Sequence, residues 1–463
     1  MCDNLRKGDW LTAYIVARLK RRPQTIKLAQ WLEKVFSNLS HLPRYLIPRY
    51  FDSIMLPLYT QLLDRVWFLS SDFVRHGDNF VQRLALGGLA LIGSQWSSPL
   101  PPLAPQSIPK SFLHLSESSK LPSMAAGFPH FASGYMRNWG RDTFISLKGL
   151  TLLTGQFDIA KVIILAFAGT LRHGLIPNLL DGGKNSRFNC RDAVWWWLQA
   201  IKDYIQIVPN GSSILEEQVR RIFPTDDSPA LVNDCDKMIL EPLHKTMQEA
   251  LNRHFEGIAF TERNAGTQID AHMTEKGFKI EIGVDRKTGF VYGGNQWNCG
   301  TWMDKMGSSS KTNNKGQPAT PRDGSPVEIV GLCKSVVTFL SELNQKGLYP
   351  YDCVRKCDQT GSLNESWTFN QWAEKIQNNF EFYFFVKDDS TEQFVNRRKI
   401  YKDTLGSTKQ WMDFQLRPNF LVAMCVAPEL FTREHAVQAL ELVDQYLLGP
   451  LGMKTLDPRF VLS

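Results

Sequence analysis

The chain has 463 residues, enough for two or more domains, and its 43% hydrophobic content is ordinary for a globular protein. A net charge of +7 is mild over this length, and no aromatic-and-basic RNA motif accompanies it, which argues against nucleic-acid binding. Apolar runs are far shorter than the ~20 residues that span a bilayer, and the N-terminus lacks a signal-peptide core. We therefore expect a cytoplasmic protein without membrane contact.

The first ~95 residues predict helices. Apolar residues recur with helical spacing over 25–39, at positions 28, 31, 32, 35, 36 and 39. The segment 50–69 is similar, and Pro57 predicts a kink or a break in its helix. Five of the 24 prolines fall in 95–110, a composition typical of a linker. We place a domain boundary there, with a helical segment at 1–110 and a second domain at 111–463.

Beyond residue 120, the sequence predicts helices joined by long polar loops, with one hairpin at 278–294. The expected helices are 157–174, 192–208, 327–347, 369–385 and 433–449. No helix–strand alternation of the doubly wound type is present. The pattern favours a mainly α fold, an (α/α)6 toroid in which loops at one end of the barrel form the site.

Several kinds of chemistry are disfavoured by missing motifs. The sequence contains neither HExxH nor GxSxG with a triad, and it has no complete phosphate-binding loop. The eight cysteines lack the spacing of a disulfide framework or a zinc site. We expect no metal and no cofactor.

The stretch 295–307, NQWNCGTWMDKMG, contains the strongest single candidate, Asp304. Trp302 and Met303 next to a carboxylate should remove water from it and raise its pKa, which suits a general acid. Such acids cleave glycosidic bonds and work with a second carboxylate, for which Asp403 and Asp413 are candidates within this sequence. The alternative is a surface acid in a flexible loop, because the following 20 residues are rich in Gly, Ser, Asn and Pro.

Two arginine–aspartate pairs stand at expected helix starts, Arg141–Asp142 and Arg191–Asp192. Each aspartate could cap its helix. Each pair could instead hold sugar hydroxyls through charge-assisted hydrogen bonds. Glu328, also at a helix start, is interpreted as a first-turn acid and not as a catalytic group.

Tryptophans cluster near these acids. Trp139 and Trp302 lie beside them, and Trp195, Trp196 and Trp197 are consecutive. Aromatic faces next to polar groups suit sugar rings, although burial in the core is the alternative. Since one helix face cannot hold three consecutive residues, at least one indole of the triplet should point elsewhere, into a cleft.

Long ordered motifs cover most of the chain, among them GFPHFASGYMRNWGRDTFI (127–145), FNCRDAVWWWLQ (188–199) and GFVYGGNQWNCGTWMDKMG (289–307). They resemble the C-terminal, amylo-α-1,6-glucosidase region of eukaryotic glycogen debranching enzymes. The resemblance continues through segments 164–180, 262–270, 318–332, 416–432 and 447–458. Residues 4–110 also resemble the part that precedes this region in the family.

The resemblance implies an (α/α)6 barrel that hydrolyses single α-1,6-linked glucosyl stubs on glycogen or phosphorylase limit dextrin, with inversion and release of glucose. It implies that Asp304 is the general acid. The implied substrate-binding residues are Trp139, Arg141, Asp142, Arg191, Asp192 and Trp302.

In the family, the general base lies beyond the segment that corresponds to 447–458. We therefore expect the base and the end of the barrel to lie outside this chain, and the missing domains of the full-length enzyme to be possible partners. The alternative function is an α-glucan-binding fragment that lacks the base and does not hydrolyse its ligand.

Overall fold

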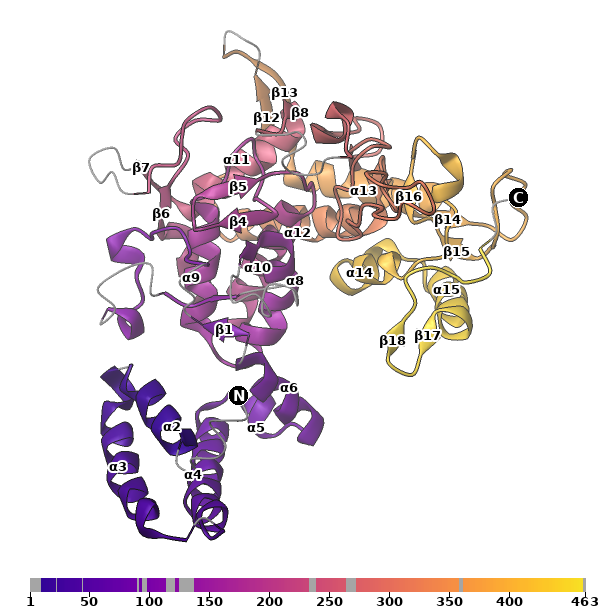
Figure 1. Ribbon diagram of the computed structural model, residues 1–463. Coiled ribbons are helices and arrows are strands. Elements are labelled where there is room, and N and C mark those ends of the chain that lie inside the picture. The colour runs from indigo at the N-terminus through magenta and orange to yellow at the C-terminus, as the bar shows by residue number, and fades with distance from the viewer. Residues whose placement is uncertain are drawn as a thin grey trace. The chain divides into compact units, whose positions relative to one another are not determined.

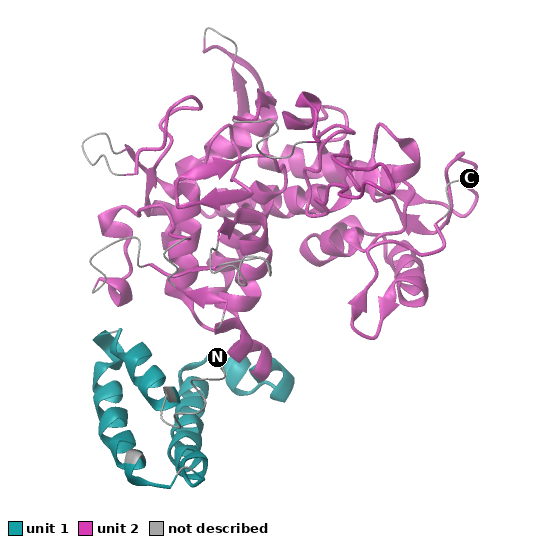
Figure 2. Ribbon diagram, in the orientation of Figure 1, with its two compact units in different colours: residues 1–82 teal, residues 83–463 magenta. Residues whose placement is uncertain are grey.

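A computed structural model describes residues 10–460, except 22, 44, 90, 94–97, 114–120, 125–136, 233–238, 264–271 and 358–360. Parts of the motifs at 127–145 and 262–270 therefore lie outside the described residues. The chain forms two compact units, residues 1–82 and residues 83–463 (Figure 2).

The first unit is helical, as predicted. Its small core contains Leu32, Phe36 and Leu39 from the predicted apolar face, whereas Trp31 on the same face is 49% exposed. The helix that contains Pro57 runs without a break, so a break at this proline was the wrong alternative. The helices are α2 (Trp10–Lys20), α3 (Ile26–Ser37), α4 (Ile47–Leu69) and α5 (Asp72–Arg75), and α6 (Asn79–Leu89) crosses the boundary between the units.

The second unit contains the main core and is rich in helices (Figure 1). They are α8 (Gly140–Leu147), α9 (Phe157–Ala168), α10 (Ala193–Ile207), α11 (Leu243–Glu256), α12 (Val327–Gln345), α13 (Phe369–Phe384), α14 (Asn419–Val426) and α15 (Arg433–Tyr446). Each of the five helices predicted in this region is present. The mainly helical fold is thus confirmed.

The helices of this unit pack closely around α10 and α12. Helix α10 contacts α8, α9 and α12, and α12 contacts α13 and α14. Gly331 of α12 allows one of these close approaches, because a Cβ atom at this position would lie 2.5 Å from Ala423 of α14. Burial of α10 on several sides explains why Trp195 and Trp197 are both fully buried and Trp196 packs against the same core. A cleft-facing tryptophan in this triplet stays a prediction, with the partly exposed Trp196 as its candidate.

Short antiparallel sheets connect the helices. The predicted hairpin at 278–294 is present as β9 (Lys279–Val284) and β10 (Val291–Gly293), with β8 (Ile258–Thr261) on the other side of β9. A second three-stranded sheet has β4 (Leu179–Asp181) between β3 (Asn138–Trp139) and β5 (Asn185–Arg187). The two-stranded sheets are β1 (Ile92–Gly93) with β2 (Ser123–Met124), β6 (Gln218–Arg221) with β7 (Ile239–Pro242), β11 (Ser325–Pro326) with β16 (Thr404–Leu405), β12 (Cys353–Cys357) with β13 (Leu363–Thr368), β14 (Phe385–Val386) with β15 (Ile400–Tyr401), and β17 (Leu448–Gly449) with β18 (Gly452–Met453).

The described part of the proline-rich segment, residues 98–110, belongs to the second unit. Leu100 and Leu103 are buried in its core, and Ser107 Oγ donates a hydrogen bond to Gln218 O at 3.0 Å. The chain separates into its two compact units after residue 82. The domain boundary placed at residue 110 rests on composition alone and stays a prediction.

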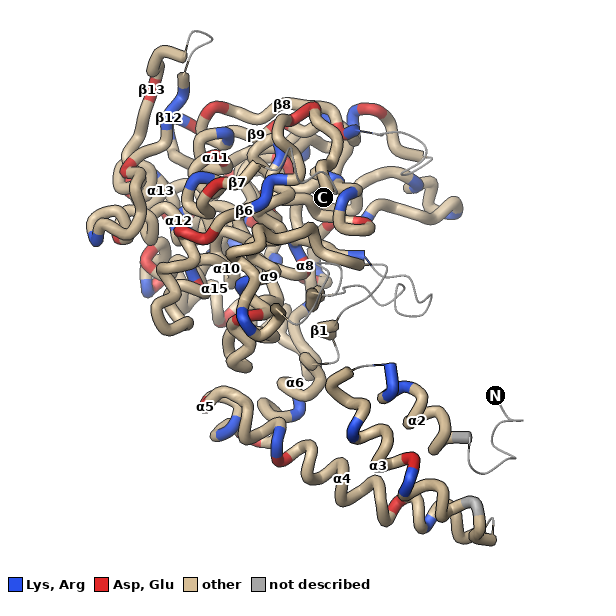
Figure 3. The backbone as a smooth tube through the Cα atoms, turned by 90° about the vertical axis from the view of Figure 1, so that its left-hand side faces the viewer, with Lys and Arg blue, Asp and Glu red and all other residues tan. Residues whose placement is uncertain are grey.

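Charged residues of both signs are interspersed along the chain (Figure 3). Among the described residues, no helix has the length and apolar character that crossing a bilayer requires.

Candidate active site

Arg141 is the centre of the candidate site. It lies in the first turn of α8, directly after Gly140, where a Cβ atom would collide with the carbonyl oxygen of Pro177. The guanidinium group is buried, and its Nε atom donates to both carboxylate oxygens of Asp192, at 2.9 and 2.8 Å. Its Nη1 atom donates to Asp304 Oδ2 at 2.7 Å. One side chain therefore joins three segments that are far apart in sequence.

The charges around Arg141 influence one another strongly. Burial alone would lower the pKa of Arg141, but the charges of Asp192 and Asp304 raise it above its usual value. Asp142 keeps solvent contact, although the atoms packed around its carboxyl group raise its pKa. Arg141 opposes this rise in the pKa of Asp142, and the nearby charge of Asp304 adds to it. Four of the predicted site residues thus form one electrostatic cluster.

The surroundings of Asp304 differ from the prediction. Its side chain is 23% exposed and contacts two cations, Arg141 and, at 3.1 Å, Lys305 Nζ. Trp302 points elsewhere, since its Nε1 atom donates to Asn419 Oδ1 at 3.0 Å. Met303 also faces Asn419, with 3.4 Å between Sδ and Nδ2. In an irregular loop, neighbours in sequence point in different directions, so the expected apolar contact with Asp304 was wrong.

Hydrogen bonds hold the loop that carries Asp304. Arg191 N donates to Gly300 O at 2.9 Å, and Thr320 Oγ1 donates to Met303 O at 2.6 Å. Arg322 Nη1 donates to Thr301 Oγ1 at 3.1 Å. The backbone amide of Ala319 donates a hydrogen bond to Lys305 O, which joins residue 319 to the same loop. These bonds fix the backbone on both sides of Asp304, which disfavours the interpretation as a surface acid in a flexible loop.

The side chain of Arg191 is buried against this loop. Its Nη2 atom donates to Arg322 O, and burial together with the charge of Arg322 lowers its pKa to about 10. Gly294 has a φ of +78°, and a Cβ atom there would collide with Arg191 Nη1. The position of Arg191 suits support of the loop that carries Asp304.

Neither aspartate of the two predicted pairs caps a helix through its side chain. Asp192 precedes α10 but makes no side-chain cap hydrogen bond, because both of its oxygens accept from Arg141. Asp142 lies inside the first turn of α8, whose N-cap residue is Trp139. Trp139 itself is partly buried, in the strand that pairs with β4.

A buried ionic network next to this site was missed by the sequence analysis. Arg322 Nε donates to Asp403 Oδ2 and Arg322 Nη2 to Glu328 Oε2, both at 2.6 Å. Asn419 Nδ2 donates to Asp403 Oδ1 at 2.7 Å. Glu328 is in the first turn of α12, as predicted, but it is fully buried, and this burial raises its pKa. Nothing in the local sequence indicates a pair formed by Arg322 and a residue 81 positions away.

The two alternative carboxylates have structural contacts. Asp403 is occupied by Arg322 and Asn419. Asp413 is buried and accepts hydrogen bonds from the backbone amides of Gly406 and Ser407, at 2.8 and 3.1 Å. Both side chains therefore hold loops together.

A second carboxyl group shares a cavity with Asp304. This cavity of about 60 Å³ is lined by Arg187, Asn189, Glu262 and Asp304, among others. Glu262 is 4% exposed and accepts a hydrogen bond from Phe188 N at 2.8 Å, and burial raises its pKa to about 7. Sequence reasoning overlooked Glu262, because its motif gave no indication of which residue faces the site.

Comparison with known proteins shows the family to which this chain belongs. Residues 107–461 match the family described as amylo-alpha-1,6-glucosidase. The chain is thus a member of a glycoside hydrolase class, and it belongs to the amylo-alpha-1,6-glucosidase family.

One relative extends the match to nearly the whole chain. The chain is 45% identical, over 468 aligned positions, to the glycogen debranching enzyme of Saccharomyces cerevisiae. The alignment covers 98% of this chain but only 29% of that enzyme. Among solved structures, neutral trehalase Nth1 from Saccharomyces cerevisiae is similar with a TM-score of 0.38 and 11% identity, over 73% of this chain and 58% of the trehalase.

Proposed function

We propose that this chain hydrolyses α-1,6-linked glucosyl stubs on glycogen limit dextrin, with inversion and release of glucose. The observation that carries the proposal is the convergence of Arg141, Asp142, Asp192 and Asp304 in one cluster. Membership of the amylo-alpha-1,6-glucosidase family supports the reaction class. The proposal includes an (α/α)6 toroid as the architecture, and a cytoplasmic location stays a prediction.

The proposed acid is Asp304. It transfers a proton to the glycosidic oxygen as the bond between this oxygen and the anomeric carbon breaks. Water attacks the anomeric carbon from the opposite face, and a base takes a proton from this water. Inverting enzymes separate acid and base by ~6.5–9.5 Å to leave space for the water. Arg141 fixes the acid in place through its 2.7 Å bond to Oδ2.

The other predicted residues divide into two groups by exposure. Asp142 is exposed beside Asp304 and is proposed to accept hydrogen bonds from hydroxyls of the terminal glucose. Trp139 and Trp302 are partly buried and are proposed as aromatic contacts of the sugar. Arg191 and Asp192 are buried, so we assign them positioning roles. Asp192 orients Arg141, and Arg191 supports the backbone of the loop at Gly300.

The direct test is glucose release from phosphorylase limit dextrin. Asp304→Asn is expected to abolish release, whereas the control Asp388→Asn, an exposed aspartate paired with Lys399, should not. If Asp304 is the acid, α-glucosyl fluoride should be hydrolysed far better by Asp304→Asn than limit dextrin is, because fluoride leaves without a proton. Equal losses on both substrates would contradict the assigned role. Inversion is checked by NMR, which should show the β-anomer of glucose first.

A second candidate is binding of α-glucan without hydrolysis. It is favoured because the other carboxylates already have hydrogen-bond partners and are not free to act as a base. Arginines bind Asp192 and Asp403, and a backbone amide binds Glu262. This candidate predicts retention on immobilised glycogen, weakened by Asp142→Ala, with no glucose release by the unchanged chain. Glucose release that depends on Asp304 would exclude it. Other domains of a longer enzyme are proposed as partners on the basis of the 29% coverage of the relative.

A further inference from the structure

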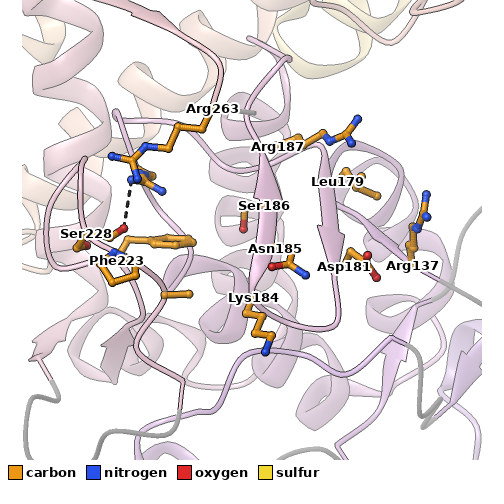
Figure 4. A pocket seen from close by; sticks show the side chains of 13 residues that line it. Arg137, Leu179, Asp181, Lys184, Asn185, Ser186, Arg187, Phe223, Ser228 and Arg263 are labelled. Carbon is orange, nitrogen blue, oxygen red and sulfur yellow. Dashed lines mark hydrogen bonds between the residues drawn. The ribbon is translucent and has the colours of Figure 1, made fainter. Parts of the chain in front are cut away.

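A second, larger cavity lies against the hairpin of β4 and β5 (Figure 4). Its volume is about 330 Å³, at the lower end of the range for small-molecule sites. Among the described residues that line it, five are cations and one, Asp181, is an acid. The cations are Arg137, Arg172, Lys184, Arg187 and Arg263.

The arginines of this cavity repel one another. The pKa of Arg172 is lowered by burial and by the charge of Arg263. The pKa of Arg187 is lowered by burial and by the charge of Arg137, although the charges of Glu262 and Asp181 oppose this. Figure 4 shows Arg263 on one side of the hairpin and Arg137 and Arg187 on the other. A bound anion would reduce the repulsion between the arginines that it contacts.

The nearby acids neutralise the cavity only in part. Asp226 is bound outside it by Arg253, and Asp227 is an exposed partner of Arg263. Glu262 has a pKa of about 7 through burial, so it carries only part of a negative charge near neutral pH. Arg172 donates to the carbonyl oxygens of Asp226 and Ser228, which leaves its charge unbalanced by direct bonds to a carboxylate.

Arg187 is the best-placed anion-binding residue. Within the described part of the chain, its guanidinium group forms no hydrogen bond or ion pair, and it lines both this cavity and the one that contains Asp304. Lys184 also lacks an ion pair among the described residues, and it is exposed at the hairpin turn. Asn185, Ser186 and Ser228 add neutral polar groups between the cations.

We propose that this cavity binds a small sugar phosphate. A phosphate monoester carries about −1.5 to −2 charges at neutral pH, and arginine donates paired hydrogen bonds to it. The amide and hydroxyl side chains can bind the hydroxyls of the sugar. This assignment does not rest on the proposed hydrolysis, because it concerns binding and needs no turnover, although Arg187 lines both cavities.

The test is isothermal titration of the full chain with glucose 6-phosphate, inorganic phosphate and glucose. We expect glucose 6-phosphate to bind best and to weaken as salt increases, because the interaction is ionic. Arg187→Gln should weaken binding about tenfold or more through loss of a charged hydrogen bond. The exposed Lys184→Gln should also weaken it and cannot disturb the core. Arg398→Gln is the matched control, because this exposed arginine donates, among the described residues, to Ser390 O alone.

Three results would overturn the assignment. If glucose binds as tightly as glucose 6-phosphate, the phosphoryl group is not recognised. If Lys184→Gln and a folded Arg187→Gln bind glucose 6-phosphate as the unchanged chain does, this cavity is not the site. Inorganic phosphate that binds as tightly as the sugar phosphate would likewise exclude recognition of the sugar.

Discussion

Arg141 Nη1 and Asp304 Oδ2 are 2.7 Å apart, although 163 positions separate these residues in the chain. Arg141 is at the same time bound by both oxygens of Asp192. The position of the proposed acid therefore depends on a guanidinium group that is anchored elsewhere, and the two interactions can be separated experimentally.

Asp304→Asn should leave stability almost unchanged, because Arg141 keeps its buried partner Asp192. Arg141→Met should destabilise the second unit by about 3–5 kcal/mol, since it leaves the fully buried Asp192 without a partner. Urea unfolding followed by tryptophan fluorescence measures both. A comparable loss of stability in the two variants would show that Asp304 contributes to the fold and not only to the site.

The variant Asp192→Asn tests whether Asp192 positions the side chain of Arg141. The amide retains the size of the carboxylate but loses its charge, so Arg141 should be held less firmly. Misplacement of the acid by about 1 Å can reduce catalysis on the order of 10²-fold. We expect kcat to fall while KM changes little, because Asp192 is buried and touches no substrate. A change in KM alone would assign Asp192 to substrate binding.

Glu262 predicts a pH dependence of stability. Its pKa is raised by burial from 4.5 to about 7 in the folded state, so between these values the folded chain binds more protons than the unfolded chain. Stability should therefore fall as pH rises from about 4.5 through 7, by at most about 3.4 kcal/mol, and this contribution stays constant above about pH 8.

Glu262→Gln keeps an oxygen for the amide of Phe188 and removes the titration. Urea unfolding at pH 5, 6, 7 and 8 should show a flatter pH dependence for this variant, and higher stability above pH 7. Identical slopes for the variant and the unchanged chain would mean that Glu262 is not the titrating group.

The contact between α12 and α14 should not tolerate a methyl group at Gly331. Its Cβ would lie 2.5 Å from Ala423, and overpacking of this kind costs about 1–3 kcal/mol. Gly149→Ala is the control, because its Cβ would have no neighbour within 4 Å. Thermal melts of both variants give the comparison, and equal melting temperatures would show that α12 and α14 can move apart freely.

The sequence predicted the parts of the fold that depend on local pattern. Helices such as α9 and α12 have long apolar faces, and the hairpin of β9 and β10 has alternating residues around a turn with Gly289 at a φ of +78°. These signals lie within one segment. Their bounds in the structure differ from the predicted ranges mainly at the ends.

Long-range pairing was beyond the reach of sequence patterns. The bonds from Arg322 to Asp403 and from Trp302 to Asn419 join residues 81 and 117 positions apart. The acid Asp304 was found through its local composition, but its actual neighbours come from other loops. Glu262 was missed for the same reason, since only the cavity reveals that it lies near Asp304.

The starts of four helices coincide with the residues of this site. Arg141 is in the first turn of α8, Asp192 immediately precedes α10, Glu328 is in the first turn of α12 and Asn419 begins α14. The amino-terminal end of a helix carries about half a positive charge from its unpaired N–H groups. The backbone therefore contributes to the positive potential that holds several carboxylates together in a small volume, in addition to the arginine side chains.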